Sequence, residues 1–362
     1  MQRYVIIGAG AQVFSAHRPG LQHPEIQIVA IAEPDEQRGH ARAAELHCPL
    51  YTDYRTMLTE VQPDVAVVLT PHPLHAEISI ACLRAGCHVL VEKPMAVHIS
   101  EADAMIAAAA ESKRLLWVVF QHRYRPEIQA IARLLQERQL GSITRVELTA
   151  SWPRPASYYQ QAPWRGTWAG EGGGVLMNQG IHHLDLLCYL LGLPERLIAW
   201  TRTRKHAIEV EDTAQALLEW SEGTLGFLHL STAEADVAER LKLVGTRGRL
   251  ELSRGQLMVE TLEQDVDSYI ATCQDPFGAP AAQPLHLDLP TGQGGHTAVY
   301  RAFQQAIRQQ DLLNAGIQGR MSLELANAII YSGRRQHEVT LPLDRAHYIE
   351  LLESLRLRSK PS

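Results

Sequence analysis

The sequence is poor in cysteine, and the few cysteines that it has are scattered. There are five in 362 residues, and no two of them are spaced as Cys-x-x-Cys (Cys48, Cys82, Cys87, Cys188 and Cys273). An odd number at these spacings excludes a disulfide framework and a zinc ribbon. We therefore expect no metal site, and a reducing compartment such as the cytoplasm.

Long apolar runs and an excess of basic residues are also missing. The run at residues 4–7 is too short for a signal peptide, and no later run approaches the roughly 18 residues of a membrane span. Lys and Arg number 34 against 40 Asp and Glu, a net charge of −6, which provides no positive field for polyanions. We expect a soluble, non-exported protein that binds neither membrane nor nucleic acid.

The chain is long enough for two domains. At about 100–200 residues per domain, 362 residues predict two, and 46% hydrophobic residues suffice for a sizeable core. Up to residue 120, apolar runs rich in Val and Ile alternate with amphipathic stretches, one of which begins near Ser100 with Asp103 as a capping acid. The runs lie at 4–7, 27–32, 65–69, 88–91 and 116–120. This βαβ series predicts a doubly wound parallel α/β sheet, a Rossmann domain, over residues 1–122.

The second part has longer, alternating strands. We expect them at 143–152, 209–220, 224–231, 241–244, 249–253 and 257–261, with helices at 126–139, 175–191, 296–309, 321–335 and 344–357. The pattern predicts an α+β domain with a large, mostly antiparallel sheet over residues 123–362. Residues 264–295 are expected to form a long surface loop, a candidate cover for a site.

A glycine-rich turn follows the first apolar run. Gly8, Gly10, Ala11 and Gln12 stand where backbone N–H groups approach a pyrophosphate at a helix N-terminus, and Val13 takes the third fingerprint position. Glu33 ends the second run, where a carboxylate accepts hydrogen bonds from a ribose and repels a 2′-phosphate. NAD is therefore favoured over NADP, although a turn without ligand and a solvated acid remain alternatives.

Further polar residues follow the third and fourth strands. Thr70, Pro71 and His75 follow one, and Glu92 and Lys93 follow the other. Open α/β sheets bind ligands at this edge, so we expect these residues to line a dinucleotide, although His75 could instead cap a helix.

At Glu92-Lys93-Pro94 the chain resembles the Gfo/Idh/MocA family of oxidoreductases. Matching segments are Gly8-Ala9-Gly10, Thr70-Pro71 with His75, residues 85–94, residues 123–126, Gly172-Gly173-Gly174, His182 with Asp185, residues 209–213 and residues 341–344. The resemblance implies NAD(P)-linked redox chemistry on sugars, polyols or their derivatives. It also implies a cis Lys93–Pro94 bond and a C-terminal sheet that serves a homo-oligomer, a dimer or tetramer.

Lys93 and His182 are the expected catalytic residues. The Lys93 ammonium can hydrogen-bond a reacting hydroxyl and stabilise a developing alkoxide, and His182 can take the proton. If residues 175–191 are helical, Asn178, His182 and Asp185 share one face, so Asn178 binds substrate and Asp185 orients the imidazole. Many relatives have Asp at position 178, so this chain leaves the proton to Lys93 and His182.

Aromatic and basic side chains gather early in the second domain and resemble the branch containing nucleotide-sugar and sugar 3-dehydrogenases. We expect Gln121, Trp164 and Arg165 to line the cofactor, and Arg123, Tyr159 and Arg165 to contact substrate. Packing within the core is the alternative for each aromatic, and Arg123 could simply fix the second domain.

Together these features predict an NAD-dependent dehydrogenase that oxidises a secondary hydroxyl of a sugar, glycoside, polyol or sugar derivative, or catalyses the reverse. One alternative retains NAD, oxidises the sugar transiently and cleaves a glycosidic bond. Another is a non-catalytic ligand sensor, which the presence of both Lys93 and His182 disfavours.

Overall fold

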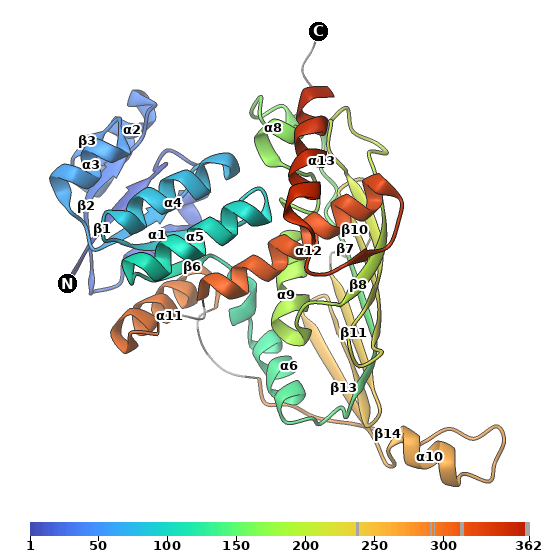
Figure 1. Cartoon of the computed structure of the whole chain (residues 1–362). Coiled ribbons are helices and arrows are strands. Elements are labelled where there is room, and N and C mark those ends of the chain that lie inside the picture. Colours follow the sequence, from blue (N-terminus) through green and yellow to red (C-terminus); the bar gives the residue numbers. More distant parts are fainter. Residues whose placement is uncertain (237–238, 290–291, 293, 312–314, 359–362) are drawn as a thin grey trace.

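The computed structural model describes residues 1–236, 239–289, 292, 294–311 and 315–358, and contains two sheets (Figure 1). The first has six parallel strands in the order β3-β2-β1-β4-β5-β6. Their bounds are β1 Gln2–Ile7, β2 Ile26–Ala32, β3 Leu50–Tyr51, β4 Val65–Val68, β5 His88–Val91 and β6 Leu116–Val118. All four β4 side chains are buried, as the Val-rich run predicts for a central parallel strand. The strand order reverses between β1 and β4, which is where such sheets bind ligands.

Helices connect these strands. They are α1 Phe14–Leu21, α2 Glu36–Leu46, α3 Tyr54–Val61, α4 His75–Arg84 and α5 Ile99–Ser112, with short 3-10 turns at His72–Leu74 and Gln121–Tyr124. The expected start of α5 is slightly wrong: it begins at Ile99, and Glu101 rather than Asp103 accepts the backbone N–H of Val97, at 2.9 Å.

One helix of the first layer comes from the far end of the chain. Helix α11 (Gly295–Gln309) packs against α1, and its Tyr300 and Phe303 share a core with Tyr4 and Phe14. A Cβ on Gly20 would lie 2.2 Å from the Tyr300 ring, so only glycine permits this contact. Part of the chain beyond the predicted boundary at residue 122 thus packs with the parallel sheet.

The second sheet has nine strands in the order β14-β13-β12-β11-β7-β10-β9-β8-β15, and only β7 and β10 pair in parallel. Their bounds are β7 Ile143–Ser151, β8 Arg196–Arg202, β9 Thr213–Glu219, β10 Leu225–Ser231, β11 Arg240–Gly245, β12 Gly248–Ser253, β13 Gln256–Leu262, β14 Ala282–Pro284 and β15 Val339–Thr340. The predicted fold class, a Rossmann sheet followed by a mostly antiparallel α+β sheet, is confirmed.

The remaining helices are α6 Pro126–Gln136, α7 Ala156–Tyr159, α8 Trp168–Glu171, α9 Ile181–Leu191, α10 Val266–Thr272, α12 Ala315–Arg335 and α13 Arg345–Arg358. Figure 1 shows α6, α9 and α12 on the side of the nine-stranded sheet that faces the first domain. Helix α12 contacts β8 and α9 on one side and α5 and β6 on the other, so it joins the two sheets. Among the described residues, none of the helices is both long enough and apolar enough to cross a bilayer.

Two expectations for the second domain are wrong. The helix expected at 175–191 begins at Ile181. Residues 175–180 form turns instead, in which the N–H of Gly180 donates to the carbonyl of Val175, five residues back and not four as in an α-helix. The Glu211 carboxylate accepts the backbone N–H groups of Gly174 (2.8 Å) and Leu176 (3.2 Å) in this segment. The loop expected at 264–295 contains α10 and β14, which lie at the end of the sheet remote from the parallel strands (Figure 1). Residues 264–284 therefore do not cover the nucleotide edge. Residues 290, 291 and 293 lie outside the described part.

Candidate active site

The turn after β1 has no room for side chains at its glycines. Gly8 has φ +82°, and a Cβ there would lie 2.9 Å from the backbone nitrogen of Thr70. A Cβ on Gly10 would lie 2.8 Å from Glu33 Oε2. Ala11 and Gln12 continue the turn, and α1 begins at Phe14. The glycines thus keep the ends of β1, β2 and β4 close together, as a dinucleotide site requires.

Glu33 lies at the end of β2 and is 8% exposed. Its Oε2 accepts the N–H of Gly10 at 2.8 Å, and its Oε1 accepts the N–H of Asp35 at 3.2 Å. Both bonds hold the carboxylate beside the glycine turn, in the position that the sequence predicts for a ribose-binding acid.

Three buried polar atoms line the same edge without a hydrogen-bond partner among the described residues. They are Thr70 Oγ1, His72 Nδ1 and Gln121 Oε1. Buried polar groups are rarely left unsatisfied, so this edge suits a ligand with several donors and acceptors. Together with the turn at Gly8 and Gly10, these atoms fit a dinucleotide.

His75 is buried and acts between two backbone carbonyls. Its Nδ1 lies 2.7 Å from Pro94 O, and its Nε2 lies 2.7 Å from Thr70 O. The ring therefore ties the end of β4 to the segment after β5, where the Lys93–Pro94 bond is cis as expected. Both ring nitrogens already have protein partners.

The Glu92 carboxylate is similarly engaged. His17 Nε2 lies 2.9 Å from Oε1, and the backbone N–H of Lys93 donates to Oε2 at 3.0 Å. Burial raises the pKa of Glu92, but hydrogen bonds from His17 and His296 and the charge of Lys93 outweigh it and hold the pKa well below the ordinary value. This acid is ionised, and both oxygens have protein partners.

Lys93 points from the nucleotide edge toward the second domain. Its Nζ donates to the backbone oxygen of Asn178 at 2.9 Å. Burial lowers the pKa of Lys93, whereas Glu92 and Glu171 raise it and Arg165 lowers it. The ammonium is thus a desolvated donor with one protein acceptor, and the Asn178 side chain is occupied separately, since its Nδ2 donates to Glu171 Oε1 at 2.6 Å.

His182 lies at the start of α9, beside this lysine. Its ring stacks on that of His122 and meets the Phe120 ring edge-on, with centroids 6.2 Å apart. Burial, then the charge of Lys93, then His122 lower the pKa of His182 well below its usual value. A neutral imidazole therefore faces the same region as the Lys93 ammonium.

Asp185 does not orient His182 as expected. Its carboxylate is 0% exposed and is held by Arg123, whose Nε donates to Oδ2 at 2.7 Å and whose Nη2 donates to Oδ1 at 2.5 Å. The Nδ1 atom of His182 is buried with no hydrogen-bond partner among the described residues. The i,i+3 spacing brings the two residues to one helix face, but the arginine takes the carboxylate.

Aromatic residues connect the nucleotide edge with Asn178. The Tyr158 hydroxyl accepts from Arg165 Nη1 at 2.8 Å and from Asn178 Nδ2 at 3.1 Å. The Arg165 guanidinium lies 4.6 Å from the centroid of the Tyr158 ring and 4.8 Å from that of Trp164. The centroid of the Trp164 ring lies 6.2 Å from that of the His72 ring, and His72 follows β4 in the chain. The structure thus brings Trp164 and Arg165 to the junction of the two domains.

A cavity of about 760 Å³ opens beside this segment. Its lining includes the bases Arg154, Arg165, Lys205 and His206, together with Tyr159 and Glu209. The hydroxyl of Tyr159 is 3.0 Å from Thr232 Oγ1, so its ring edges the cavity while its polar end is fixed by the sheet. The three cations Arg154, Arg165 and Lys205 against the one acid Glu209 make this space locally positive.

Three residues of this site were not predicted from the sequence. Glu171 is 2% exposed and binds both the N–H of Gly166, at 2.6 Å, and the Asn178 side chain. His122 stacks on His182, and His17 holds Glu92. The position of His122 directly after the fifth apolar run was a usable indication, but nothing local to Glu171 or His17 indicates their partners.

Comparisons with known proteins agree with this geometry. Residues 2–120 match the family model described as an oxidoreductase family with an NAD-binding Rossmann fold, and residues 128–251 match the GFO/IDH/MocA C-terminal domain. The chain is 29% identical over 255 residues to bovine (Bos taurus) trans-1,2-dihydrobenzene-1,2-diol dehydrogenase, covering 69% of this chain and 73% of that one. It is 31% identical over 197 residues to the D-glucoside 3-dehydrogenase of Escherichia coli K12, covering 53% and 54%.

A solved structure extends the likeness over nearly the whole chain. The WlbA dehydrogenase of Bordetella pertussis, in complex with NADH and UDP-GlcNAcA, superposes with a TM-score of 0.81 at 27% identity, covering 94% of this chain and 99% of that one.

The fold and the nucleotide edge define an NAD-binding oxidoreductase. The chain belongs to the Gfo/Idh/MocA family, since both of its domains match models of that family. NAD is its cofactor.

Proposed function

We propose that this oxidoreductase is a dehydrogenase that converts a secondary hydroxyl of a sugar or sugar derivative to a ketone, or catalyses the reverse. The observation that carries the proposal is the pairing of a partly buried ammonium, Lys93, with a neutral imidazole, His182, next to the dinucleotide edge. Alcohol oxidation needs both a donor for the developing alkoxide and an acceptor for the proton.

Each residue has a role that follows from its position. Gly8, Gly10 and Glu33 hold the adenosine half of NAD, and Thr70 and Gln121 offer polar atoms toward the other half. When bound, NAD supplies the acceptor of the hydride that leaves the carbinol carbon. His182 takes the hydroxyl proton, and Lys93 donates a hydrogen bond to the oxygen as the carbonyl forms. Proton and hydride then account for the two hydrogens lost.

The basic cavity favours a substrate with an anionic group. The Arg154 guanidinium lies 5.2 Å from the Tyr158 ring centroid, and its Nε is buried without a hydrogen-bond partner among the described residues. Arg165 and Lys205 line the same space. We therefore propose that the reacting sugar ring lies near Lys93 and that a carboxylate or phosphate of the same substrate lies against these cations. The structure of the WlbA relative in complex with the nucleotide sugar UDP-GlcNAcA supports the proposal that the substrate carries an anionic group.

The test is to follow reduced-nicotinamide absorbance with NAD and a panel of neutral glycosides, sugar acids and nucleotide sugars. We expect NADH to form with one anionic class, and Arg154→Met to raise KM for that class while leaving turnover of any neutral substrate unchanged. Lys242→Met, on the distant strand β11, is the matched control and should change neither. No NADH with any member of the panel would overturn the dehydrogenase proposal. Release of a glycosidic leaving group without net NADH would instead support the NAD-retaining alternative.

We also propose that the nine-stranded sheet joins two copies of the chain. Its outer face carries an apolar row in which Leu217 lies opposite Ile198 on β8 and Phe227 on β10. Leu217 is 52% exposed and Trp200 47% exposed. Exposed apolar side chains that adjoin one another are typical of protein interfaces. Light scattering should give a dimer or tetramer that Leu217→Arg dissociates, and a wild-type monomer would overturn this proposal.

A further inference from the structure

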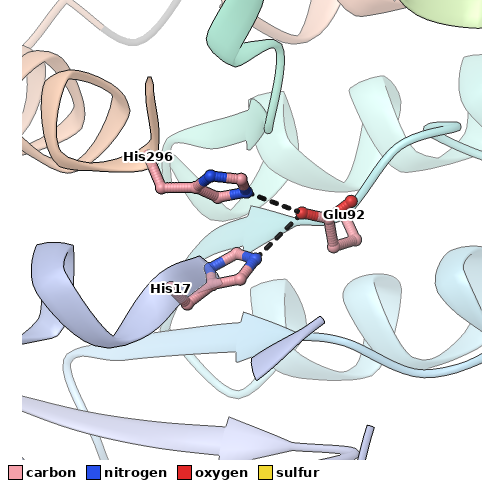
Figure 2. Close-up of side chains that lie close together, drawn as sticks. All are labelled: His17, Glu92 and His296. Carbon is pink, nitrogen blue, oxygen red and sulfur yellow. Dashed lines mark hydrogen bonds and ion pairs between the residues drawn. The ribbon is translucent and has the colours of Figure 1, made fainter. Parts of the chain in front are cut away.

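Three potential metal ligands meet behind the nucleotide edge. His17 lies on α1, Glu92 follows β5, and His296 lies in the first turn of α11 (Figure 2). Their ligand atoms all lie within 4.8 Å of one another, and among the described residues no other group of at least three His, Cys, Asp or Glu is as close. Figure 2 shows both imidazoles pointing at the same carboxylate.

The spacing suits a tetrahedral ion. His17 Nε2 is 2.9 Å and His296 Nε2 is 3.7 Å from Glu92 Oε1. Two ligands of a tetrahedral zinc, each about 2.0–2.1 Å from the metal, are about 3.3 Å apart. One observed distance is slightly shorter than this and the other slightly longer, so small side-chain rotations bring both nitrogens into range of one ion.

The surroundings of these residues resemble the outer shell of a metal site. The Tyr300 hydroxyl lies 3.0 Å from His17 Nδ1, the nitrogen that faces away from Glu92. Ligating histidines are commonly held by such a hydrogen bond on the second nitrogen. The backbone N–H of Lys93 fixes Glu92 Oε2 at 3.0 Å and leaves Oε1 to face the two imidazoles.

We propose that His17, Glu92 and His296 form a binding site for a divalent transition metal, with zinc the best fit. Two imidazoles and one carboxylate are donors that zinc accepts, and the fourth position is left for water. The ion would join α1, the segment after β5 and α11.

The proposal of a metal site does not depend on the proposed substrate, because it concerns metal binding alone. His17 and Glu92 are 75 positions apart and His296 lies in the last quarter of the chain, so no local sequence motif indicates this cluster.

The experiment is a zinc titration of untagged, chelator-treated protein against a competing fluorescent chelator. We expect one Zn²⁺ per chain in the wild type, and at least tenfold weaker binding in His296→Ala and in Glu92→Gln. His347→Ala is the matched control, because its side chain is 65% exposed and lies on α13, away from the cluster. It should bind zinc as the wild type does.

Thermal unfolding provides a second readout. Because a ligand that binds only the native state stabilises it, zinc should raise the Tm of the wild type and of His347→Ala but not that of His296→Ala. His296 is partly exposed, so its removal should leave Tm in chelator near the wild-type value. Absence of stoichiometric binding in the wild type, or wild-type affinity in both cluster variants, would overturn the proposal. Neither of these outcomes bears on the dehydrogenase proposal, which the reduced-nicotinamide assay tests separately.

Discussion

The imidazole rings of His122 and His182 stack, with centroids 4.6 Å apart and 17° between their planes. Burial lowers the pKa of both, that of His122 to about 4. Two adjacent imidazoles inside a site that also holds the Lys93 ammonium make protonation of either unfavourable. Both rings are therefore neutral at pH 7.

The first prediction concerns pH. Because His182 accepts a proton only when neutral and its pKa is lowered, kcat/KM should stay level as the pH falls through 6.5 and decline only well below it. His182→Asn should lower kcat by about 10²–10⁴-fold and remove this acid limb. The control His183→Asn changes the neighbouring residue, which instead pairs with Glu239 at 3.0 Å, and should keep the limb. An acid limb centred near 6.5 would contradict the assignment.

The second prediction tests the ammonium. Lys93→Met removes the donor to the developing alkoxide, so kcat should fall by about 10²–10³-fold, as when one oxyanion donor is lost. NAD affinity, measured by calorimetry, should change little, because the glycine turn and Glu33 are untouched. Lys113→Met, an exposed lysine after α5, is the control and should be fully active. Wild-type turnover in Lys93→Met would refute its catalytic role.

The local pattern of hydrophobic residues was enough to predict much of the fold. The run Val65–Val68 predicts a buried parallel strand because every side chain is apolar, and the structure buries all four. By contrast, the start of α9 could not be located from its own residues. Glu211, 37 positions from Gly174, binds backbone N–H groups of the turns that precede α9. Tertiary hydrogen bonds of this kind leave no periodic trace in the sequence.

The residues of the candidate site also fall into those that the sequence could predict and those that it could not. Lys93 could be found because the carboxyl end of a parallel strand is where such sheets bind ligands, and the structure places its Nζ against Asn178. The partner of Asp185 could not, because helical spacing shows only which residues share a face. Arg123, 62 positions upstream, reaches that carboxylate from the 3-10 turn after β6.

The third prediction concerns this ion pair. Since Asp185 is 0% exposed, Arg123→Met leaves a buried carboxylate without its guanidinium and should lower the free energy of unfolding by about 3–5 kcal/mol. Urea unfolding measures the loss. Arg240→Met breaks a 2.9 Å pair with Glu251 on the sheet surface and should have almost no effect, because solvent screens exposed pairs. Equal stability losses in the two variants would show that burial does not set the value of the Arg123 pair.

The fourth prediction concerns the choice of cofactor. Glu33 repels the 2′-phosphate of NADP, and two arginines are nearby: the Cβ of Arg38 lies 3.0 Å from a Cβ built on Gly10, and Arg42 Nε donates to Ala9 O at 3.0 Å. Glu33→Ser removes the repulsion and leaves both cations, so the ratio of kcat/KM for NADP to that for NAD should rise at least tenfold.

Another acid that caps a helix of the first domain provides the control for Glu33. Asp53 caps α3 by accepting the N–H of Thr56 at 3.2 Å, so Asp53→Ser should leave the cofactor ratio unchanged. The loss of the Gly10 hydrogen bond in Glu33→Ser should also weaken NAD itself, because the turn loses the acceptor at 2.8 Å that holds it. The ratio is therefore the decisive measurement: if both cofactors weaken equally, Glu33 shapes the turn but does not select against the 2′-phosphate.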